Sequence, residues 1–169
     1  MKAHTIVVGY DGSADARKAL DVAVDHVADD GVVHVVTAYH ELSRSQLMEV
    51  MAAMPDEYRQ GFDPSATVRG YLRDAELLLD DEGVAHVGHF VDEHPAAAIL
   101  DLADEVAADL IVMGSRGLGR VQRFLRGSVS ARVANHATTS LMIVHHDDAD
   151  RLEHAGGHGR GTHGTVSAA

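Results

Sequence analysis

Thr5-Ile6-Val7-Val8-Gly9-Tyr10-Asp11-Gly12-Ser13 is the stretch of sequence that decides the fold. The β-branched run at its start carries no charge, as expected of a parallel strand that is covered on both faces. A tight Asp11-Gly12 turn follows, and Ser13 is a favourable N-cap for a helix whose apolar residues recur at helical spacing as far as Ala28. The stretch therefore predicts a strand that enters a helix through an acidic turn.

The same alternation of short apolar runs and helical patterns continues along the chain and predicts βαβ units. The expected strands are 5–9, 32–39, 84–91, 110–113 and 140–144, and the expected helices are 13–28, 65–81, 95–106 and 128–136. Residues 41–64 are interpreted as an insertion with a short amphipathic helix that Pro55 stops. The expected fold class is α/β, an open five-stranded parallel sheet with helices on both faces.

The composition is that of one compact soluble domain. The chain has 169 residues, of which 46% are hydrophobic and 24% charged, and domains typically hold about 100 to 200 residues. We expect the domain to span residues 1–146, because residues 147–169 are rich in Asp, Gly and His and predict a disordered tail. Without an apolar run of about 18 residues or a signal-peptide core, we expect a cytoplasmic protein with no membrane partner.

The acidic charge balance excludes several function classes. The 26 Asp and Glu outnumber the 14 Lys and Arg, which gives a net charge of -12 and disfavours nucleic acid as a partner. The absence of cysteine excludes disulfides, thiolate metal sites and cysteine nucleophiles. An acidic surface with only two lysines, Lys2 and Lys18, suggests a halophilic protein from a high-salt cytoplasm; the alternative is an ordinary acidic protein.

The halophilic interpretation predicts a melting temperature that is higher in molar salt than in dilute buffer, because salt screens the self-repulsion of the acidic surface. Thermal melting in the two buffers measures this difference. A lower melting temperature in molar salt would contradict the interpretation.

Glycines and arginines gather after the expected strand at 110–113. The segment 110–146 contains no acidic residue and five arginines, Arg116, Arg120, Arg123, Arg126 and Arg132. The glycines at 114, 117, 119 and 127 allow close approach of a ligand to the backbone, and Ser128 and Ser130 begin a helix, where N–H groups and the dipole favour a phosphate. An anion near this loop explains the pattern; the alternative is a basic patch that pairs with acidic surface elsewhere.

The loop resembles that of a known family. Gly114-x-x-Gly117, nine residues and then Gly127-Ser128 is similar to the G-2x-G-9x-G-(S/T) pattern of the ATP-binding universal stress proteins, the UspA family. Residues 109–117, 127–130 and 6–13 resemble the strands and turns around that pattern, and the resemblance runs from about Thr5 to Val144. It implies a Rossmann-like fold similar to that of the adenine nucleotide alpha hydrolases. Ser140 departs from the family, which often has proline there.

The resemblance also implies an adenine-nucleotide site that holds ATP with Mg or Mn. Asp11 would bond the ribose, Ala38 would lie by the adenine, and the glycines would admit the triphosphate, to which Ser128 and Ser130 would donate. The full set of expected cofactor-binding residues is Gly9, Asp11, Ala38, Met113, Gly114, Arg116, Gly117, Gly127, Ser128, Val129 and Ser130. No residue is assigned to the metal. The alternative for Asp11 is that it only shapes its turn or caps the helix.

The implied function is that of a stress-response regulatory module, a homodimer through Leu141 to Val144, whose ATP occupancy changes its conformation or partner. The alternatives are a weak ATPase or nucleotidyl-transferring enzyme of the same fold, and a stress protein that binds no nucleotide. The loop lacks the lysine of a P-loop, so strong hydrolysis is not expected, whereas slow turnover or phosphorylation of Ser128 or Ser130 stays open.

Two histidine patterns compete with this interpretation. His86-Val87-Gly88-His89 spells the HxGH pattern of nucleotidylyltransferases, but it lies within an expected strand, where the two histidines point to opposite faces. The histidines of the tail are spread among glycines without the fixed spacing of a helical metal site. A solvated tail is favoured over a weak transition-metal site.

Overall fold

The computed structural model describes residues 2–39, 44–59, 61–115 and 128–145. The elements are β1 (Ala3–Gly9), α1 (Ala14–His26), β2 (Val27–Ala38), α2 (Arg44–Ala53), α3 (Asp56–Arg59), α4 (Ala66–Asp81), β3 (His86–Val91), α5 (Pro95–Glu105), β4 (Leu110–Gly114), α6 (Ser128–His136) and β5 (Ser140–Val144). The expected tail and most of the glycine-rich loop lie outside the described residues.

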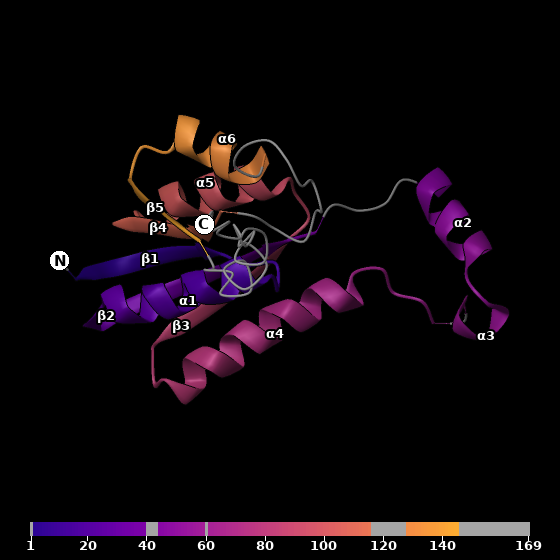
Figure 1. Cartoon of the computed structure of the whole chain (residues 1–169), viewed down its shortest axis with the longest axis horizontal. Coiled ribbons are helices and arrows are strands. Elements are labelled where there is room, and N and C mark those ends of the chain that lie inside the picture. Colours follow the sequence, from indigo (N-terminus) through magenta and orange to yellow (C-terminus); the bar gives the residue numbers. More distant parts are fainter. Residues whose placement is uncertain (1, 40–43, 60, 116–127, 146–169) are drawn as a thin grey trace, which may run out of the picture.

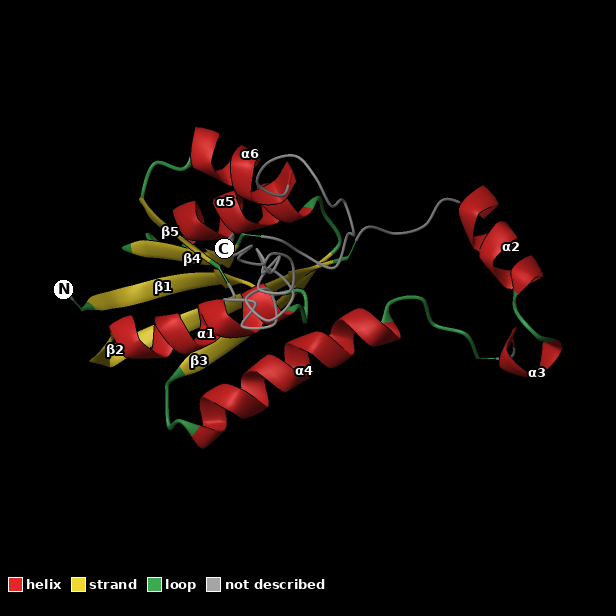
Figure 2. Ribbon diagram, in the orientation of Figure 1, coloured by secondary structure: helices red, strands yellow, loops and turns green. Residues whose placement is uncertain are grey.

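The five strands form one parallel sheet with the order β3-β2-β1-β4-β5. Helices α1 and α4 cover one face, and α5 and α6 cover the other (Figures 1 and 2). The predicted α/β fold class is therefore confirmed. The order places the topological switch point between β1 and β4, because the chain leaves β1 toward one edge and returns at β4 to build the other.

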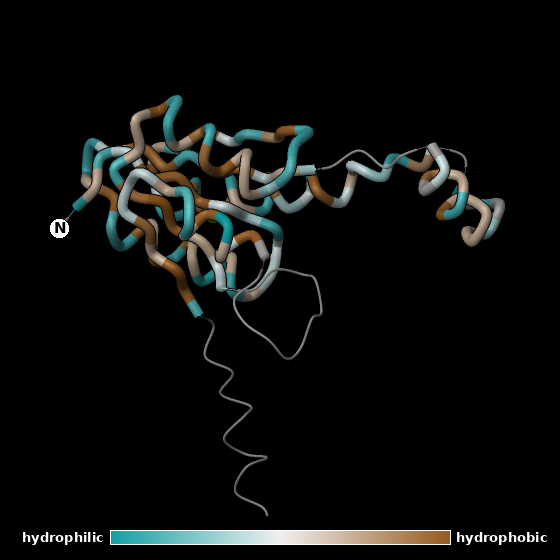
Figure 3. The backbone as a smooth tube through the Cα atoms, turned by 90° about the horizontal axis from the view of Figure 1, so that it is seen from above, coloured by the Kyte–Doolittle hydropathy of each residue, from teal (hydrophilic) through white to brown (hydrophobic). Residues whose placement is uncertain are grey.

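The core consists of two apolar layers that the alternation along the central strands separates. Ile6 and Val8 of β1 pack with α1 and α4, whereas Val7 packs with α5 and α6. All three side chains are fully buried, which explains why the strand reads as an unbroken apolar run. In Figure 3, hydrophobic residues gather in the interior of the domain and hydrophilic residues lie mostly around them.

The second strand is longer than predicted. The sequence predicts a helix over 13–28 and a strand that begins at Val32, but α1 ends at His26 and β2 begins at Val27. Val27 is buried and pairs with Ala3, and the register then shifts before Thr5 pairs with Val32. The sequence pattern does not predict a strand at 27–31, because the acidic residues and Gly31 in this segment are typical of turns.

Most other helix boundaries follow the predicted end signals. Ser13 caps α1, and its Oγ accepts a hydrogen bond from the N–H of Ala16, while Pro95 is the first residue of α5. Gly83 ends α4 with a φ of 68°, a left-handed conformation that glycine adopts readily. The N–H of Val84 bonds the Leu79 carbonyl oxygen at this helix end, so β3 begins at His86, two residues later than expected.

The expected insertion contains two helices instead of one. Helix α2 covers the predicted amphipathic segment, and α3 follows Pro55. Both helices lie away from the sheet and its covering helices (Figures 1 and 3). Met48 of α2 is 64% exposed, so its apolar side chain contributes little to the core of the domain.

The end of β4 lies against the first turn of α1. A Cβ atom on Gly114 would lie 2.8 Å from the carbonyl carbon of Asp15 and 2.9 Å from the backbone nitrogen of Ala16. Backbone atoms cannot swing aside as a flexible side chain can. A glycine at this position therefore lets the helix approach the strand closely.

Replacing Gly114 with alanine should lower the free energy of unfolding by about 1–3 kcal/mol, the usual cost of overpacking. Gly70→Ala is the matched control, since a Cβ atom on Gly70 meets nothing within 4 Å, and alanine should stabilise α4 by about 0.5–1 kcal/mol. Urea denaturation of both variants measures the difference. If Gly114→Ala leaves the free energy of unfolding unchanged, α1 moves aside without a loss of stability.

Candidate functional site

The candidate site lies where the carboxyl ends of β1 and β4 meet. Gly9 at the end of β1 pairs with Met113 of β4, and Gly114 follows at the strand end beside Val144 of β5. In open parallel sheets, ligands bind in the crevice outside the carboxyl ends of the strands at the switch point. The sheet thus brings three of the expected cofactor-binding residues, Gly9, Met113 and Gly114, to the place where a ligand is expected.

Asp11 shapes the turn between β1 and α1. Its Oδ1 accepts a hydrogen bond of 3.0 Å from the N–H of Ser13, and Gly12 between them has a φ of 78°. A Cβ atom on Gly12 would also lie 2.5 Å from the ring of Tyr71, so both the conformation and the space require glycine. The turn-shaping role that the sequence left open is confirmed, and this bond fixes the half-buried carboxylate at the edge of the sheet.

The end of β2 is tied to the end of β1 by two hydrogen bonds. The N–H of Tyr10 donates to the Val36 carbonyl oxygen over 3.0 Å, and the buried Thr37 hydroxyl donates to the Tyr10 carbonyl oxygen over 3.0 Å. Ala38, the last residue of β2, is half-buried. It therefore lies at the same sheet edge as the Asp11 turn.

A buried polar cluster joins α1, β4 and α6 next to Gly114. The Ser115 hydroxyl donates a 2.6 Å hydrogen bond to Asp15 Oδ2, and the Ser130 hydroxyl donates to the Ser115 carbonyl oxygen over 3.4 Å. All three residues are buried, with Asp15 only 6% exposed. A carboxylate at such a depth needs hydrogen-bond partners, and its place in the first turn of α1 favours its negative charge.

Asp15 and Ser115 are not among the site residues that the sequence predicts. Two signals could have identified them: an acidic residue in the first turn of the helix after β1, and a hydroxyl directly after the last glycine of β4. Their contact depends on the packing of α1 against β4. No local pattern specifies that packing.

The other expected site residues are only partly described. Met113 is buried among the apolar residues under α5 and α6, so its backbone and not its side chain lies at the sheet edge. Ser128 begins α6 as predicted, and Val129 is half-buried in its first turn. Arg116, Gly117 and Gly127 lie outside the described residues.

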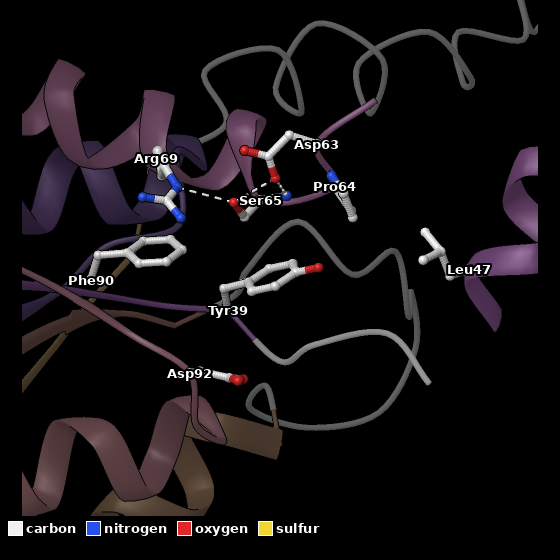
Figure 4. Close-up of a pocket in the computed structure, with 8 residues that line it drawn as sticks. All are labelled: Tyr39, Leu47, Asp63, Pro64, Ser65, Arg69, Phe90 and Asp92. Carbon is white, nitrogen blue, oxygen red and sulfur yellow. Dashed lines mark hydrogen bonds between the residues drawn. The ribbon is translucent and has the colours of Figure 1, made fainter. Parts of the chain in front are cut away.

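A hollow of about 400 Å³ lies beside the ends of β2 and β3 (Figure 4). It is lined by Tyr39, Leu47, Asp63, Pro64, Ser65, Arg69, Phe90 and Asp92. The rings of Tyr39 and Phe90 stack with centroids 6.1 Å apart, and the Arg69 guanidinium lies 4.6 Å from the centroid of the Phe90 ring. The sequence analysis did not anticipate this hollow, because its residues come from the insertion, two strands and α4.

Hydrogen bonds order the polar wall of this hollow. Asp63 Oδ1 accepts from the Ser65 hydroxyl over 2.7 Å and from the Ser65 N–H over 2.8 Å. These two bonds lower the pKa of Asp63. Arg69 Nε in turn donates to Ser65 Oγ over 3.0 Å, so the wall offers a carboxylate and a guanidinium that share one serine.

The two histidines of the HxGH pattern face opposite sides of the sheet. His86 Nε2 lies 3.8 Å from Asp80 at the end of α4, whereas His89 Nε2 lies 3.0 Å from His34 Nδ1 of β2. The expectation that they diverge is confirmed. They cannot act on one phosphate in the manner of a nucleotidylyltransferase.

Two further findings concern metals and membranes. Within residues 2–39, 44–59, 61–115 and 128–145, no three His, Cys, Asp or Glu side chains gather in a way that could hold a metal ion. Among the helices that the structure describes, none is both long and apolar enough to cross a membrane.

Comparison with known proteins gives consistent matches along the chain. The profile of the universal stress protein family matches residues 2–145. The universal stress protein Rv1636 of Mycobacterium tuberculosis is 32% identical over 142 residues, which cover 83% of this chain and 95% of that protein. These matches cover the whole described domain.

Solved structures share the fold. A universal stress protein in complex with cAMP is 31% identical, with a TM-score of 0.62 over 86% of this chain and 98% of that chain. The protein MJ0577 has a TM-score of 0.69 over 88% of this chain and 100% of that chain, at 18% identity. The second likeness concerns the fold alone.

Ser115→Ala should lower the free energy of unfolding by about 1–3 kcal/mol, because it leaves the buried Asp15 carboxylate without this donor. The matched control is Thr138→Ala, which removes an exposed hydroxyl that donates to Asp104 over 3.2 Å and should change stability by less than about 0.5 kcal/mol. Urea denaturation measures both. Equal losses in the two variants would contradict a special role for the buried bond.

Proposed function

The chain belongs to the universal stress protein family, and we propose that it binds ATP with Mg or Mn as a stress-response regulatory module. The observation that carries the proposal is the meeting of Gly9, Asp11, Ala38 and Gly114 at the carboxyl edge of the sheet. The 31% identical universal stress protein that was solved with cAMP supports an adenine nucleotide as the ligand.

The arrangement of this edge suggests an orientation for the nucleotide. Asp11 is fixed by its turn, so its carboxylate can accept hydrogen bonds from ribose hydroxyls. Ala38 presents a small side chain at the end of β2, where the adenine would lie. The phosphates would then extend toward Gly114 and the first turn of α6, where backbone N–H groups favour anions.

The charge distribution supports the placement of the phosphates. The chain carries a net charge of -12, yet residues 110–146 contain only basic charges, at five arginines. An acidic surface repels a triphosphate, and a segment without acidic residues reduces that repulsion locally. Arg116, Gly117, Gly127, Ser128, Val129 and Ser130 complete the proposed site.

The edge of the sheet at β5 suggests how two copies of the protein assemble. Strand β5 is an edge strand of the sheet, and Leu141 to Val144 form an apolar edge that pairing with a second copy would cover. We propose a cytoplasmic homodimer with a domain at residues 1–146 and a tail at 147–169. The halophilic character stays a proposal that rests on the acidic, lysine-poor composition.

We propose a binding module in preference to an enzyme, because the proposed site offers mainly backbone groups and small residues, with Asp11 for the ribose and Arg116 near the phosphates. A fresh preparation should release ATP on denaturation, and its ATP turnover should equal that of a blank. Measurable turnover would favour the weak ATPase, and a preparation that neither carries nor binds nucleotide would favour a stress protein without that ligand.

Asp11→Asn should weaken ATP binding by about tenfold, which corresponds to roughly 1.4 kcal/mol. The asparagine oxygen still accepts the bond from the Ser13 N–H, so the turn is kept while the charged acceptor for the ribose is lost. Isothermal titration calorimetry with MgATP measures the change. Gly127→Val should abolish binding in the same assay, because a side chain would occupy the space that the family pattern leaves for phosphate.

Asp101→Asn is the matched control for Asp11→Asn, since it makes the same change of charge at an exposed position of α5. We expect its ATP affinity to equal that of the unmodified protein. If Asp11→Asn also binds ATP with unchanged affinity, Asp11 serves only its turn and the proposed ribose contact is wrong.

A further inference from the structure

His34 and His89 form a close pair across β2 and β3. His34 Nδ1 lies 3.0 Å from His89 Nε2, and the two rings have centroids 5.3 Å apart with planes 28° from parallel. In the register of the strands, His34 pairs with Val87 and Val36 pairs with His89. The two histidines are therefore diagonal neighbours on one face of the sheet, held by two adjacent strands.

The pair lies at the rim of the face that α5 covers. His34 shares that face with Val36, whose side chain packs under α5, and α5 itself contacts β1 and β2. Strand β3 is the edge of the sheet, and Val87 beside the pair is 44% exposed. The half-buried rings are thus fixed by the sheet on one side and accessible from solvent on the other.

The charge state of His34 suits a metal ion. Burial, followed by the neighbouring His89, lowers the pKa of His34, while Glu105 at the end of α5 acts in the opposite direction. A lowered pKa keeps the ring neutral near pH 7, and neutral imidazole is the form that coordinates metals.

We propose that His34 Nδ1 and His89 Nε2 together bind one divalent transition-metal ion, with water in the remaining coordination positions. Two nitrogens that bind one ion at about 2.0–2.1 Å in neighbouring positions lie roughly 2.8–3.4 Å apart. The observed 3.0 Å falls within this range. Cu²⁺ should bind more tightly than Zn²⁺ because it stands higher in the Irving–Williams order.

When both rings are neutral, metal binding changes a tautomer and releases no proton. One of the two facing nitrogens carries the hydrogen that the pair shares, and this hydrogen moves through solvent to the other nitrogen of the same ring when the metal binds. Both facing nitrogens then carry a lone pair, and a rotation of the rings turns these lone pairs toward the ion. No third His, Cys, Asp or Glu in the described parts of the chain completes the site, so the affinity should be modest.

Cu²⁺ titration of the full chain, followed by ¹H–¹⁵N NMR, tests the proposal. Paramagnetic Cu²⁺ broadens signals near its binding site, so substoichiometric Cu²⁺ should broaden the backbone signals of residues 33–35 and 88–90. This readout separates the pair from the other histidines of the chain. If Cu²⁺ broadens only signals outside β2 and β3 of the unmodified protein, the proposal is wrong. This test needs no variant.

His89→Gln and His86→Gln form a matched pair of variants within the same motif. His89→Gln should abolish the broadening at residues 33–35, whereas His86→Gln, which changes the other face of the sheet, should keep it. Loss of even an outer-shell partner typically weakens metal binding about tenfold or more, so loss of a direct ligand should exceed this. Unchanged broadening in a folded His89→Gln would also contradict the site.

Discussion

The contact between the end of β4 and the first turn of α1 is the constraint on which the candidate site depends. Gly114 leaves no room for a side chain there, and the buried bond from Ser115 to Asp15 fastens the strand end to the helix. Through the Ser130 hydroxyl, the same cluster reaches the first turn of α6. The positions of the Asp11 turn and of α6 are thus set by one small buried region.

A glycine in this pattern can serve either of two purposes, the close packing of a helix or space for a ligand. A run of glycines after a strand suggests space for a ligand, but at Gly114 the space is filled by α1. In that helix turn, the N–H of Ala16 bonds the Ser13 hydroxyl. At Gly114, the glycine therefore serves the close packing of α1 against β4.

The sequence predicted the five strands and the helices that cover the sheet, because unbroken apolar runs and end signals such as Ser13, Gly83 and Pro95 act locally. The extension of β2 to Val27 escaped prediction because acidic residues and Gly31 mimic a turn. The Asp15–Ser115 bond, the hollow beside Phe90 and the histidine pair could not be predicted. Each depends on the packing or register of segments that are distant in the chain.

The Asp15–Ser115 bond also has a consequence for the order of folding. Its two residues are 100 positions apart, so closing the bond requires that a long loop has already lost its entropy. Contacts of such separation form slowly compared with local helices and turns. The turn that carries Asp11 can form early from neighbouring residues, whereas its alignment with β4 and α6 waits for the assembly of the central strands.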